Sequence, residues 1–406
     1  MRELIARLEG WQGEQIEFLG RLVNHDSGTD DVLDVNRVGA ILAERLESLG
    51  FTVSRVAQEH FGDHLVAEKP GRGPRRFLFV GHFDTVFPSG TVKERPFHVA
   101  GGRAYGPGVY DMKGGLTALL YALRAHRETR SRAWDDVSIA IVFNSDEERL
   151  SPTSRAVIET QARRAHSVGI LEPARPGGEY VMARKGAGVF RLEVTGKSSH
   201  AGLQPELGAS AIWDLAQKVA ELHTLTSFDT GTTVNVGVIR GGTRPNVIAD
   251  RAAADIDLRV WTTEEAARAT VRMREICERV RVPGTAARFT GAIQFPPWPP
   301  GDPGTARLLE IMQATGRDLG VEVKAIATGG GSDGNHTSQL APTIDGLGPR
   351  GSRAHSEEEF IELATLLERT KMLAGFLERW ATEFEVPSRL TSQRPPAATN
   401  TPTMAP

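Results

Sequence analysis

Short, fully apolar strands that alternate with helical segments constrain the fold of this chain most strongly. Three such runs are residues 77–80, 137–143 and 168–171. Apolar side chains at every position of a strand predict burial on both faces, which is typical of a parallel sheet covered by helices. Residues 31–50 show the helical repeat instead, with apolar side chains on one face and Gly50 as the stop. We therefore expect an α/β fold with a mixed, largely parallel sheet flanked by helices.

Six side chains suited to metal binding or acid–base chemistry follow these strands or lie in glycine-rich turns: His82, Asp111, Glu147, Glu148, Glu172 and His355. The carboxyl ends of parallel strands meet at one edge of a sheet, so we expect these side chains to gather there. Two imidazoles and several carboxylates suit a pair of divalent metals that share one bridging carboxylate. Two-metal sites of this kind typically catalyse hydrolysis, and the pattern predicts an enzyme that cleaves an amide bond.

The first two motifs each have a simpler interpretation when taken alone. Asp84 fits either as the carboxylate that fixes the tautomer of His82 or as a cap at a polar strand end. Asp111 lies in a glycine-dense segment that favours close approach of the backbone to a bound species, although a helix N-cap is the alternative.

The remaining candidates also leave alternatives open. Glu147 and Glu148 follow an apolar strand, and in an extended segment they point opposite ways, which divides a metal ligand from a general base. A solvated acidic turn is the other interpretation. In isolation, Glu172 and His355 read as loop residues, and His200 reads as a surface histidine or as a group that reaches a substrate.

Residues 184–294 follow a different pattern of strand, helix, two strands, helix and strand. That βαββαβ order is typical of a ferredoxin-like unit. The first pattern then resumes, so we expect a catalytic domain made of residues 1–183 and 295–385, with the second unit inserted. A long amphipathic helix is predicted to begin at Glu357, and the tail 386–406, rich in Pro, Thr and Ala, is predicted to be disordered.

Bulk properties exclude several other classes of protein. A length of 406 residues favours two domains, and a net charge of -3 argues against nucleic acid as a partner. The N-terminus lacks the apolar core of a signal peptide, and no apolar run reaches the roughly 18 residues that a membrane span needs. The single Cys277 excludes an intramolecular disulfide, so a cytoplasmic protein with a buried, inert thiol is expected.

Taken together, the motifs resemble the di-zinc peptidases and deacylases typified by glutamate carboxypeptidase. Acetylornithine deacetylase, succinyl-diaminopimelate desuccinylase and aminoacylase belong to the same superfamily. The resemblance covers roughly residues 5–383 in one motif order, which is far more specific than any single motif. It is carried by His82, Asp84, Asp111, Lys113-Gly114-Gly115, Glu147-Glu148, Glu172, Ser199-His200-Ala201-Gly202 and His355.

This resemblance implies a role for each residue of the predicted metal site. Glu147 would be the general base, and Asp84 would orient His82. A cis peptide bond is expected at Asp111–Met112, although the residue that follows is not proline. The implied metal ligands are Asp111 as the bridge, His82 and Glu172 on one metal, and Glu148 and His355 on the other.

The resemblance also implies how substrate is held. The inserted domain would be a lid and the dimerisation surface, and His200 would enter the active site of the partner subunit to bind the substrate carbonyl. Arg259 and Asn246 resemble ligands of the substrate carboxylate and of the scissile region. Gly330 lies in a loop that resembles the substrate-facing loop of the family. A glutamate at position 172 is the choice of carboxypeptidases and deacylases.

Three positions depart from the family pattern. Ala249 stands where the family often has proline, and Glu179 and Val181 stand where glutamate carboxypeptidase has a pocket lysine and serine. The resemblance therefore does not imply release of glutamate from folate-type substrates.

We expect a homodimeric, metal-dependent hydrolase that cleaves a peptide or N-acyl amide bond next to a free carboxylate. Zinc is the expected metal, and cobalt or manganese stays open because carboxylate-rich sites accept several metals. An aminopeptidase or dipeptidase of the same superfamily is the alternative. A binding protein on a hydrolase fold would have lost ligands or the base, and none is missing here. The sequence does not predict which acyl group or side chain is selected.

Overall fold

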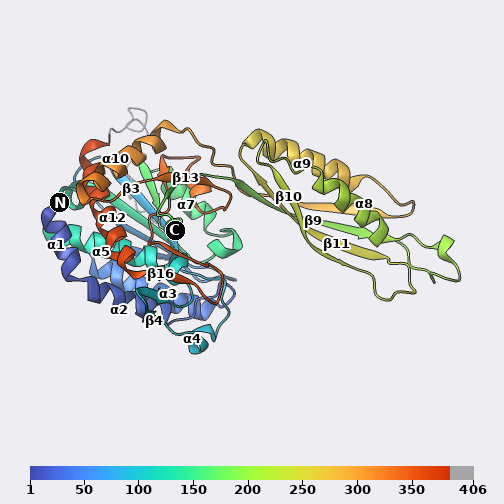
Figure 1. Cartoon of the computed structure of the whole chain (residues 1–406), viewed down its shortest axis with the longest axis horizontal. Helices are drawn as coiled ribbons and strands as arrows, with labels where there is room; N and C mark the ends of the chain where they lie inside the picture. Colours follow the sequence, from blue (N-terminus) through green and yellow to red (C-terminus); the bar gives the residue numbers. More distant parts are fainter. Residues whose placement is uncertain (385–406) are drawn as a thin grey trace, which may run out of the picture.

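A six-stranded sheet forms the centre of the larger of two units (Figure 1). In the order β1-β2-β6-β3-β7-β14, its strands are Thr52–Val56, His64–Lys69, Ser138–Asn144, Arg76–His82, Ser167–Ile170 and Thr343–Ile344. The last four strands pair in parallel, whereas β1 and β2 are antiparallel additions at one edge. The expected mixed, largely parallel sheet is thus confirmed. The computed structural model describes residues 1–384, so the predicted tail at 386–406 lies outside the described residues.

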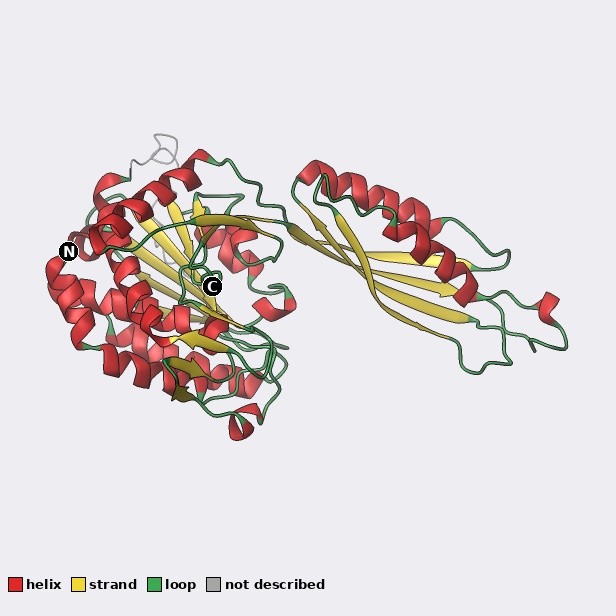
Figure 2. Ribbon diagram, in the orientation of Figure 1, coloured by secondary structure: helices red, strands yellow, loops and turns green. Residues whose placement is uncertain are grey.

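Alternate side chains of the central strands enter two separate cores, one on each face of the sheet. Phe77 and Phe79 of β3 pack into the first core, while Leu78 and Val80 pack into the second. Helices therefore lie on both sides of the strands (Figure 2). The helices of this unit are α1 (Arg2–Gly10), α2 (Gln12–Val23), α3 (Val32–Ser48), α4 (Thr91–Glu94), α5 (Gly114–Thr129), α6 (Arg132–Asp136), α7 (Arg155–Ala162), α10 (Pro303–Leu319), α11 (Gly334–Thr337) and α12 (Leu363–Glu383), with the short turns η1 (Val109–Lys113) and η2 (Glu147–Arg149).

Two predicted helices can be compared with the structure directly. The helix expected over residues 31–50 is α3, where the Asp31 side chain accepts the Asp34 backbone N–H at 3.1 Å as an N-cap. The start predicted for the last helix at Glu357 is wrong, because β16 (Phe360–Glu362) first pairs with β5 (Arg103–Tyr105). The other short strands of this unit are β4 (His98–Ala100), β15 (Gly351–Ser352), β8 (Tyr180–Arg184) and β13 (Ala325–Thr328).

A four-stranded antiparallel sheet forms the second unit, which projects from the first in Figure 1. Its elements follow the predicted βαββαβ order: β9 (Gly186–Thr195), α8 (Ala211–His223), β10 (Thr233–Gly241), β11 (Arg251–Val260), α9 (Thr263–Glu278) and β12 (Ala286–Phe295), with the turn η3 (Pro205–Leu207). The strand order β10-β11-β9-β12 places the first strand in the middle, next to the last. Cys277 is buried here, as predicted. The role of the second unit as a lid and the domain boundaries at residues 183/184 and 294/295 stay predictions.

Across residues 1–384, no helix combines the length and the apolar content needed to cross a membrane.

A histidine buried in α11 makes the stability of the larger unit depend on pH. His336 is 1% exposed, and within residues 1–384 neither ring nitrogen has a hydrogen-bond partner. Burial lowers its pKa to about 4. Because the unfolded chain takes up this proton near pH 6.5, the contribution to stability is complete above that pH and is lost as the pH falls towards 4.

We expect the substitution His336→Phe to remove this part of the acid sensitivity, which amounts to about 1.4 kcal/mol per pH unit between those limits. Phenylalanine keeps the edge-on contact with Phe295, whose ring centroid lies 5.0 Å from that of His336. The measurement is thermal unfolding at pH 7 and pH 5 with a chelator in both samples, and the exposed His60→Phe is the control. An equal loss of stability on acidification in the variant and the parent would contradict the expectation.

Candidate metal centre

The predicted metal ligands meet at the carboxyl edge of the sheet. His82 is the last residue of β3, Glu148 lies in η2 after β6, and Glu172 follows β7. The ligand atoms of His82, Asp111 and Glu148 lie within 4.8 Å of one another. The same spacing holds for His82, Glu147 and Glu172. Parallel strands thus gather residues that are up to ninety positions apart in the chain, as the sequence predicts.

Distances between the side chains fit shared metal ions. His82 Nε2 lies 3.2 Å from Asp111 Oδ1 and 3.7 Å from Glu172 Oε1. His355 Nε2 lies 3.4 Å from Asp111 Oδ2 and 3.2 Å from Glu148 Oε2. Two ligands that are each about 2.0–2.1 Å from a tetrahedral metal stand roughly 3.3 Å apart. Asp111 therefore has one oxygen near His82 and the other near His355, as a carboxylate shared by two sets of ligands must.

Glu147 is less clearly separated from the ligands. One of its carboxylate oxygens shares the 4.8 Å group with His82 and Glu172, so distance alone does not distinguish a base from a ligand. The expectation of an extended segment is wrong: Glu147 and Glu148 lie in the helical turn η2, because Asp146 accepts backbone and hydroxyl hydrogens from Thr153 and Ser154 and folds the chain back. The two glutamates nevertheless face different carboxylates of the cluster.

Asp84 connects the histidine to the turn that carries both glutamates. Its carboxylate accepts the backbone N–H groups of Glu147 and Glu148 at 3.3 Å each, and the Thr29 hydroxyl at 2.8 Å. His82 Nδ1 lies 3.0 Å from the Asp84 carbonyl oxygen and 3.4 Å from its carboxylate. Asp84 is fully buried, so these contacts fix the ring of His82 and the position of η2 together.

The loop that carries Asp111 has the expected cis peptide bond at Asp111–Met112. The interpretation of Asp111 as a helix N-cap is wrong, since α5 begins at Gly114 and its N-cap is Lys113. A Cβ on Gly115 would lie 2.0 Å from the Leu171 carbonyl oxygen. This glycine is therefore needed for close contact between α5 and the residue that follows β7, which places Glu172 beside Asp111. Close approach of the backbone to a bound species stays a prediction.

Glu359 is a buried residue beside the predicted metal ligands that the sequence analysis misses. Its buried carboxylate accepts the backbone N–H groups of Gly108 at 3.1 Å, Tyr110 at 2.8 Å and Asp111 at 3.0 Å. Burial raises its pKa to about 7, against the effect of these bonds. Glu359 ends a run of three glutamates after Ser356, which reads as a solvated turn, and nothing in the sequence separates it from its neighbours.

We expect Glu359→Ala to weaken metal binding by about 10–100-fold, because three buried N–H groups would lose the acceptor that holds the Asp111 loop. Glu359→Gln should recover part of the affinity, since one oxygen already serves Tyr110 and Asp111. Competition with a chromophoric chelator measures this, and the exposed Glu357→Ala is the control. Unchanged affinity in Glu359→Ala would show that the loop holds its position without this carboxylate.

The crowding of buried carboxyl groups in this cluster raises their pKa values and favours the binding of a cation in place of their protons. Burial raises the pKa of Glu172 to about 8, and burial with nearby carboxylates raises that of Glu147 well above its usual range. Hydrogen bonds to Asp111 and Glu148 raise the pKa of His355 to about 10. A divalent ion bound here must displace the protons of the histidines and of Glu172, so metal affinity falls at low pH.

The predicted substrate-binding residues lie outside this cluster. His200 and Asn246 are neighbours, joined by the hydrogen bond from the Ala201 N–H to the Asn246 carbonyl at 3.0 Å, in loops of the second unit. Arg259 Nε donates to Asp257 at 3.0 and 3.1 Å. Within residues 1–384 no hydrogen bond or ion pair joins these three to the metal ligands. The Gly330 carbonyl, in the larger unit, accepts Arg184 Nη1 at 3.0 Å.

The α/β sheet and the cluster at its carboxyl edge define a metal-dependent hydrolase. A model of the peptidase family M20/M25/M40 matches residues 78–379, and the chain belongs to this family. The superfamily resemblance predicted from the motifs is thus confirmed.

Two sequence relatives and one solved structure show how far the similarity extends. Carboxypeptidase G2 of Pseudomonas sp. (strain RS-16) is 31% identical over 370 residues, which cover 89% of this chain and 88% of the relative. Succinyl-diaminopimelate desuccinylase of Rhodospirillum centenum (strain ATCC 51521 / SW) is 27% identical over 359 residues, covering 82% and 90%. The crystal structure of aminopeptidase PepT from Bacillus cereus ATCC 10987 matches with a TM-score of 0.76 at 23% identity, covering 91% of this chain and 99% of that chain, and supports the fold.

Proposed function

We propose that the protein hydrolyses a peptide or N-acyl amide bond next to a free carboxylate, with two divalent metals, most simply zinc. The observation that carries this proposal is the spacing of His82 and His355 on the two oxygens of Asp111. The two sequence relatives support the substrate class, since they are named as a carboxypeptidase and a desuccinylase. A glutamate at position 172 supports the same class through the family pattern.

In this mechanism, His82 and Glu172 would hold one ion, Glu148 and His355 would hold the other, and Asp111 would be shared by both sets of ligands. Two divalent ions held there would supply Lewis-acid polarisation of the carbonyl and would lower the pKa of a water molecule. Glu147 accepts a proton from the attacking water and returns it to the leaving nitrogen. Asp84 fixes the position of the His82 ring relative to the turn that carries Glu147.

We assign the substrate carboxylate to the Gly330 side of the cluster. Arg259 and Asn246 of the second unit would bind the substrate there. Arg259 is paired with Asp257, so it must exchange or share that partner when a substrate carboxylate binds. His200 of the partner subunit would donate a hydrogen bond to the oxyanion.

A homodimer through the second unit fits the exposed groups on its edge. β10 is an edge strand of the sheet among the described residues, and Ile239 on it is 55% exposed. Trp213 on the adjacent helix α8 is 63% exposed. Edge strands of this kind are normally covered, and a second copy would cover this one. The cytoplasmic location stays a prediction from the sequence.

Amide hydrolysis by the purified, zinc-loaded protein tests the proposal. The panel contains N-acyl amino acids, C-terminal glutamyl peptides and free dipeptides, each with a chelator control. Chelator-sensitive cleavage of N-blocked substrates is expected. Cleavage restricted to substrates with a free amino terminus would identify an aminopeptidase or dipeptidase instead, and two bound metals without cleavage of any member would favour a binding role.

A further inference from the structure

A buried network outside the predicted ligand set holds the turn that carries Glu147. Asp333 precedes α11 and is 2% exposed, and both of its carboxylate oxygens accept hydrogen bonds. The Ser151 hydroxyl donates to Oδ1 at 2.5 Å, and Asn144 Nδ2 donates to Oδ2 at 2.7 Å. Asn144 ends β6 and Ser151 follows η2, so one carboxylate binds the chain on both sides of the turn.

The chain that leaves η2 has a strained backbone. Leu150 has a φ of 69° and Ser151 a φ of 52°, in the left-handed region that residues with a Cβ rarely adopt. Such residues persist only where the surrounding structure holds them. Ser151 is buried, and its hydroxyl and its N–H donate to Asp333 and to the Asp146 carbonyl oxygen. These two bonds therefore hold the strained end of the turn.

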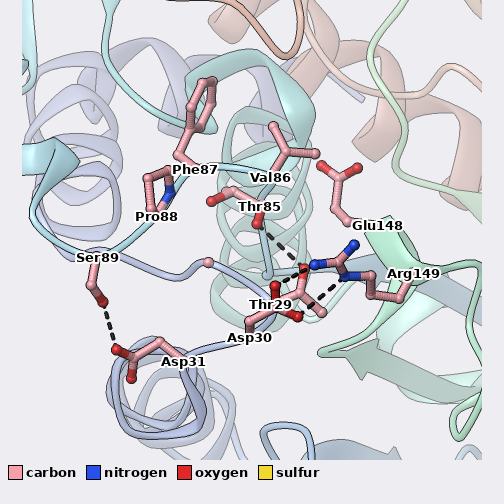
Figure 3. A pocket seen from close by; sticks show the side chains of 11 residues that line it. Thr29, Asp30, Asp31, Thr85, Val86, Phe87, Pro88, Ser89, Glu148 and Arg149 are labelled. Carbon is pink, nitrogen blue, oxygen red and sulfur yellow. Dashed lines mark hydrogen bonds and ion pairs between the residues drawn. The ribbon is translucent and has the colours of Figure 1, made fainter. Parts of the chain in front are cut away.

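The outer side of η2 is only weakly restrained. Figure 3 shows Glu148 and Arg149 of this turn at an open pocket that residues 85–89 also line. Arg149 Nε donates to Asp30 at 3.2 Å, but these two side chains are 54% and 73% exposed. Exposed ion pairs contribute little to the stability of a turn. The buried bonds to Asp333 are therefore the stronger restraint.

The segment that carries Asp333 is anchored by contacts outside the metal cluster. Asn335 Nδ2 donates to the carbonyl oxygens of Lys185 at 3.1 Å and Pro296 at 2.8 Å, which lie in the two segments that join the larger unit to the second. Asn335 Oδ1 accepts the Ser332 N–H at 3.0 Å. The position of Asp333 is thus fixed by bonds that include neither Glu147 nor a predicted metal ligand.

We propose that Asp333 is a positioning residue for the general base, and that through Ser151 and Asn144 it fixes the direction in which η2 presents Glu147. Asp84 accepts N–H groups at the start of the turn, whereas Asp333 acts beyond its end, so the two restraints are separate. The inference rests on the proposed function, because it needs Glu147 as the base. Displacement of a catalytic geometry by about 1 Å can lower a rate by about 10²-fold.

Steady-state kinetics on the substrate that the parent cleaves best test the proposal. Asp333→Ala removes both bonds and should lower kcat by about 10²-fold, while KM and metal content stay unchanged. Ser151→Ala removes one bond and should lower kcat by about tenfold. Ser167→Ala is the matched control, because it removes another fully buried serine hydroxyl, which accepts the Trp380 Nε1–H at 3.0 Å at the end of β7 away from the cluster. It should keep the parental kcat.

Two further variants separate positioning from stability. Ser151→Gly adopts the positive φ without strain, so it should unfold at a temperature no lower than that of Ser151→Ala, yet its kcat should be as low. Asp333→Asn should recover much of the kcat, since its amide oxygen can accept from Asn144 while its nitrogen donates to the Ser151 oxygen. A kcat that recovers together with the Tm in Ser151→Gly would show a purely structural role and overturn the proposal.

A double-mutant cycle tests whether Ser151 acts through Asp333. In the Asp333→Ala background, Ser151→Ala should lower kcat by less than about twofold. Additive losses, or a parental kcat in both single variants, would overturn the positioning role while hydrolysis by the parent stands. The two Ser151 variants carry the test alone if Asp333→Ala does not fold. A parent that hydrolyses no amide would overturn the proposed function, and the role of Asp333 with it.

Discussion

Replacing Glu147 with glutamine is expected to lower kcat by about 10²–10⁴-fold while the protein keeps its metals. Glutamine has the shape of glutamate but cannot accept the proton of the attacking water. The turn that carries it should not move, because Asp84 holds that turn through the backbone N–H groups of Glu147 and Glu148 rather than through side chains. Steady-state kinetics and metal content after dialysis, measured on the same preparation, check both parts of the expectation.

Two outcomes would contradict the role of Glu147 in different ways. Full activity would remove it from the position of general base. Loss of one metal equivalent together with activity would identify Glu147 as a ligand. This is possible because ligand atoms of Glu147, His82 and Glu172 lie within 4.8 Å of one another. The exposed Glu17→Gln, which removes a carboxylate on α2 far from the cluster in sequence, controls for a general effect of the substitution.

The centre of the larger unit could be predicted because the residue types along a strand indicate which of its two faces are buried. Continuous apolar runs at β3 and β6 leave no polar face, so helices must cover both sides of the sheet. Once the strands are parallel, their carboxyl ends coincide, and His82, Glu148 and Glu172 must be neighbours. Asp111 entered the prediction through its glycine-rich loop, whose contacts depend on tertiary structure.

Other features depended on contacts that local sequence does not reveal. Glu359 looks like its two glutamate neighbours, and only the folded chain shows that it alone is buried against the Asp111 loop. The turn η2 replaced the expected extended segment because Asp146 bonds residues seven and eight positions later. The helix start at Glu357 was wrong for a similar reason, since pairing of β16 with β5 is a long-range contact.

The residues of the second unit show a further limit of sequence reasoning. Motif order placed His200, Asn246 and Arg259 with the substrate, but the single chain pairs Arg259 with Asp257 and keeps the loop of His200 within the second unit. Whether these residues reach a substrate depends on a partner chain or on movement between the two units. Neither is a property of local sequence pattern, so these roles rest on the dimer and substrate experiments.

Replacing Asp111 with asparagine is expected to disrupt both metal positions at once. Its two oxygens lie 3.2 Å from His82 Nε2 and 3.4 Å from His355 Nε2, and an amide offers only one oxygen in their place. Metal affinity should therefore fall by more than the about 10–100-fold expected for Glu359→Ala, which leaves all ligands present. Stoichiometry by elemental analysis should drop below two, with turnover lost.

Thermal unfolding gives an independent measure of the same event. A ligand present at 100 times its Kd stabilises the folded state by about 2.7 kcal/mol, so added zinc should raise the Tm of the parent protein and raise that of Asp111→Asn much less. The exposed Asp229→Asn should respond to zinc like the parent. Two tightly held metals in Asp111→Asn would overturn the bridging assignment, and the two histidine groups would then have to be separate sites that share no carboxylate.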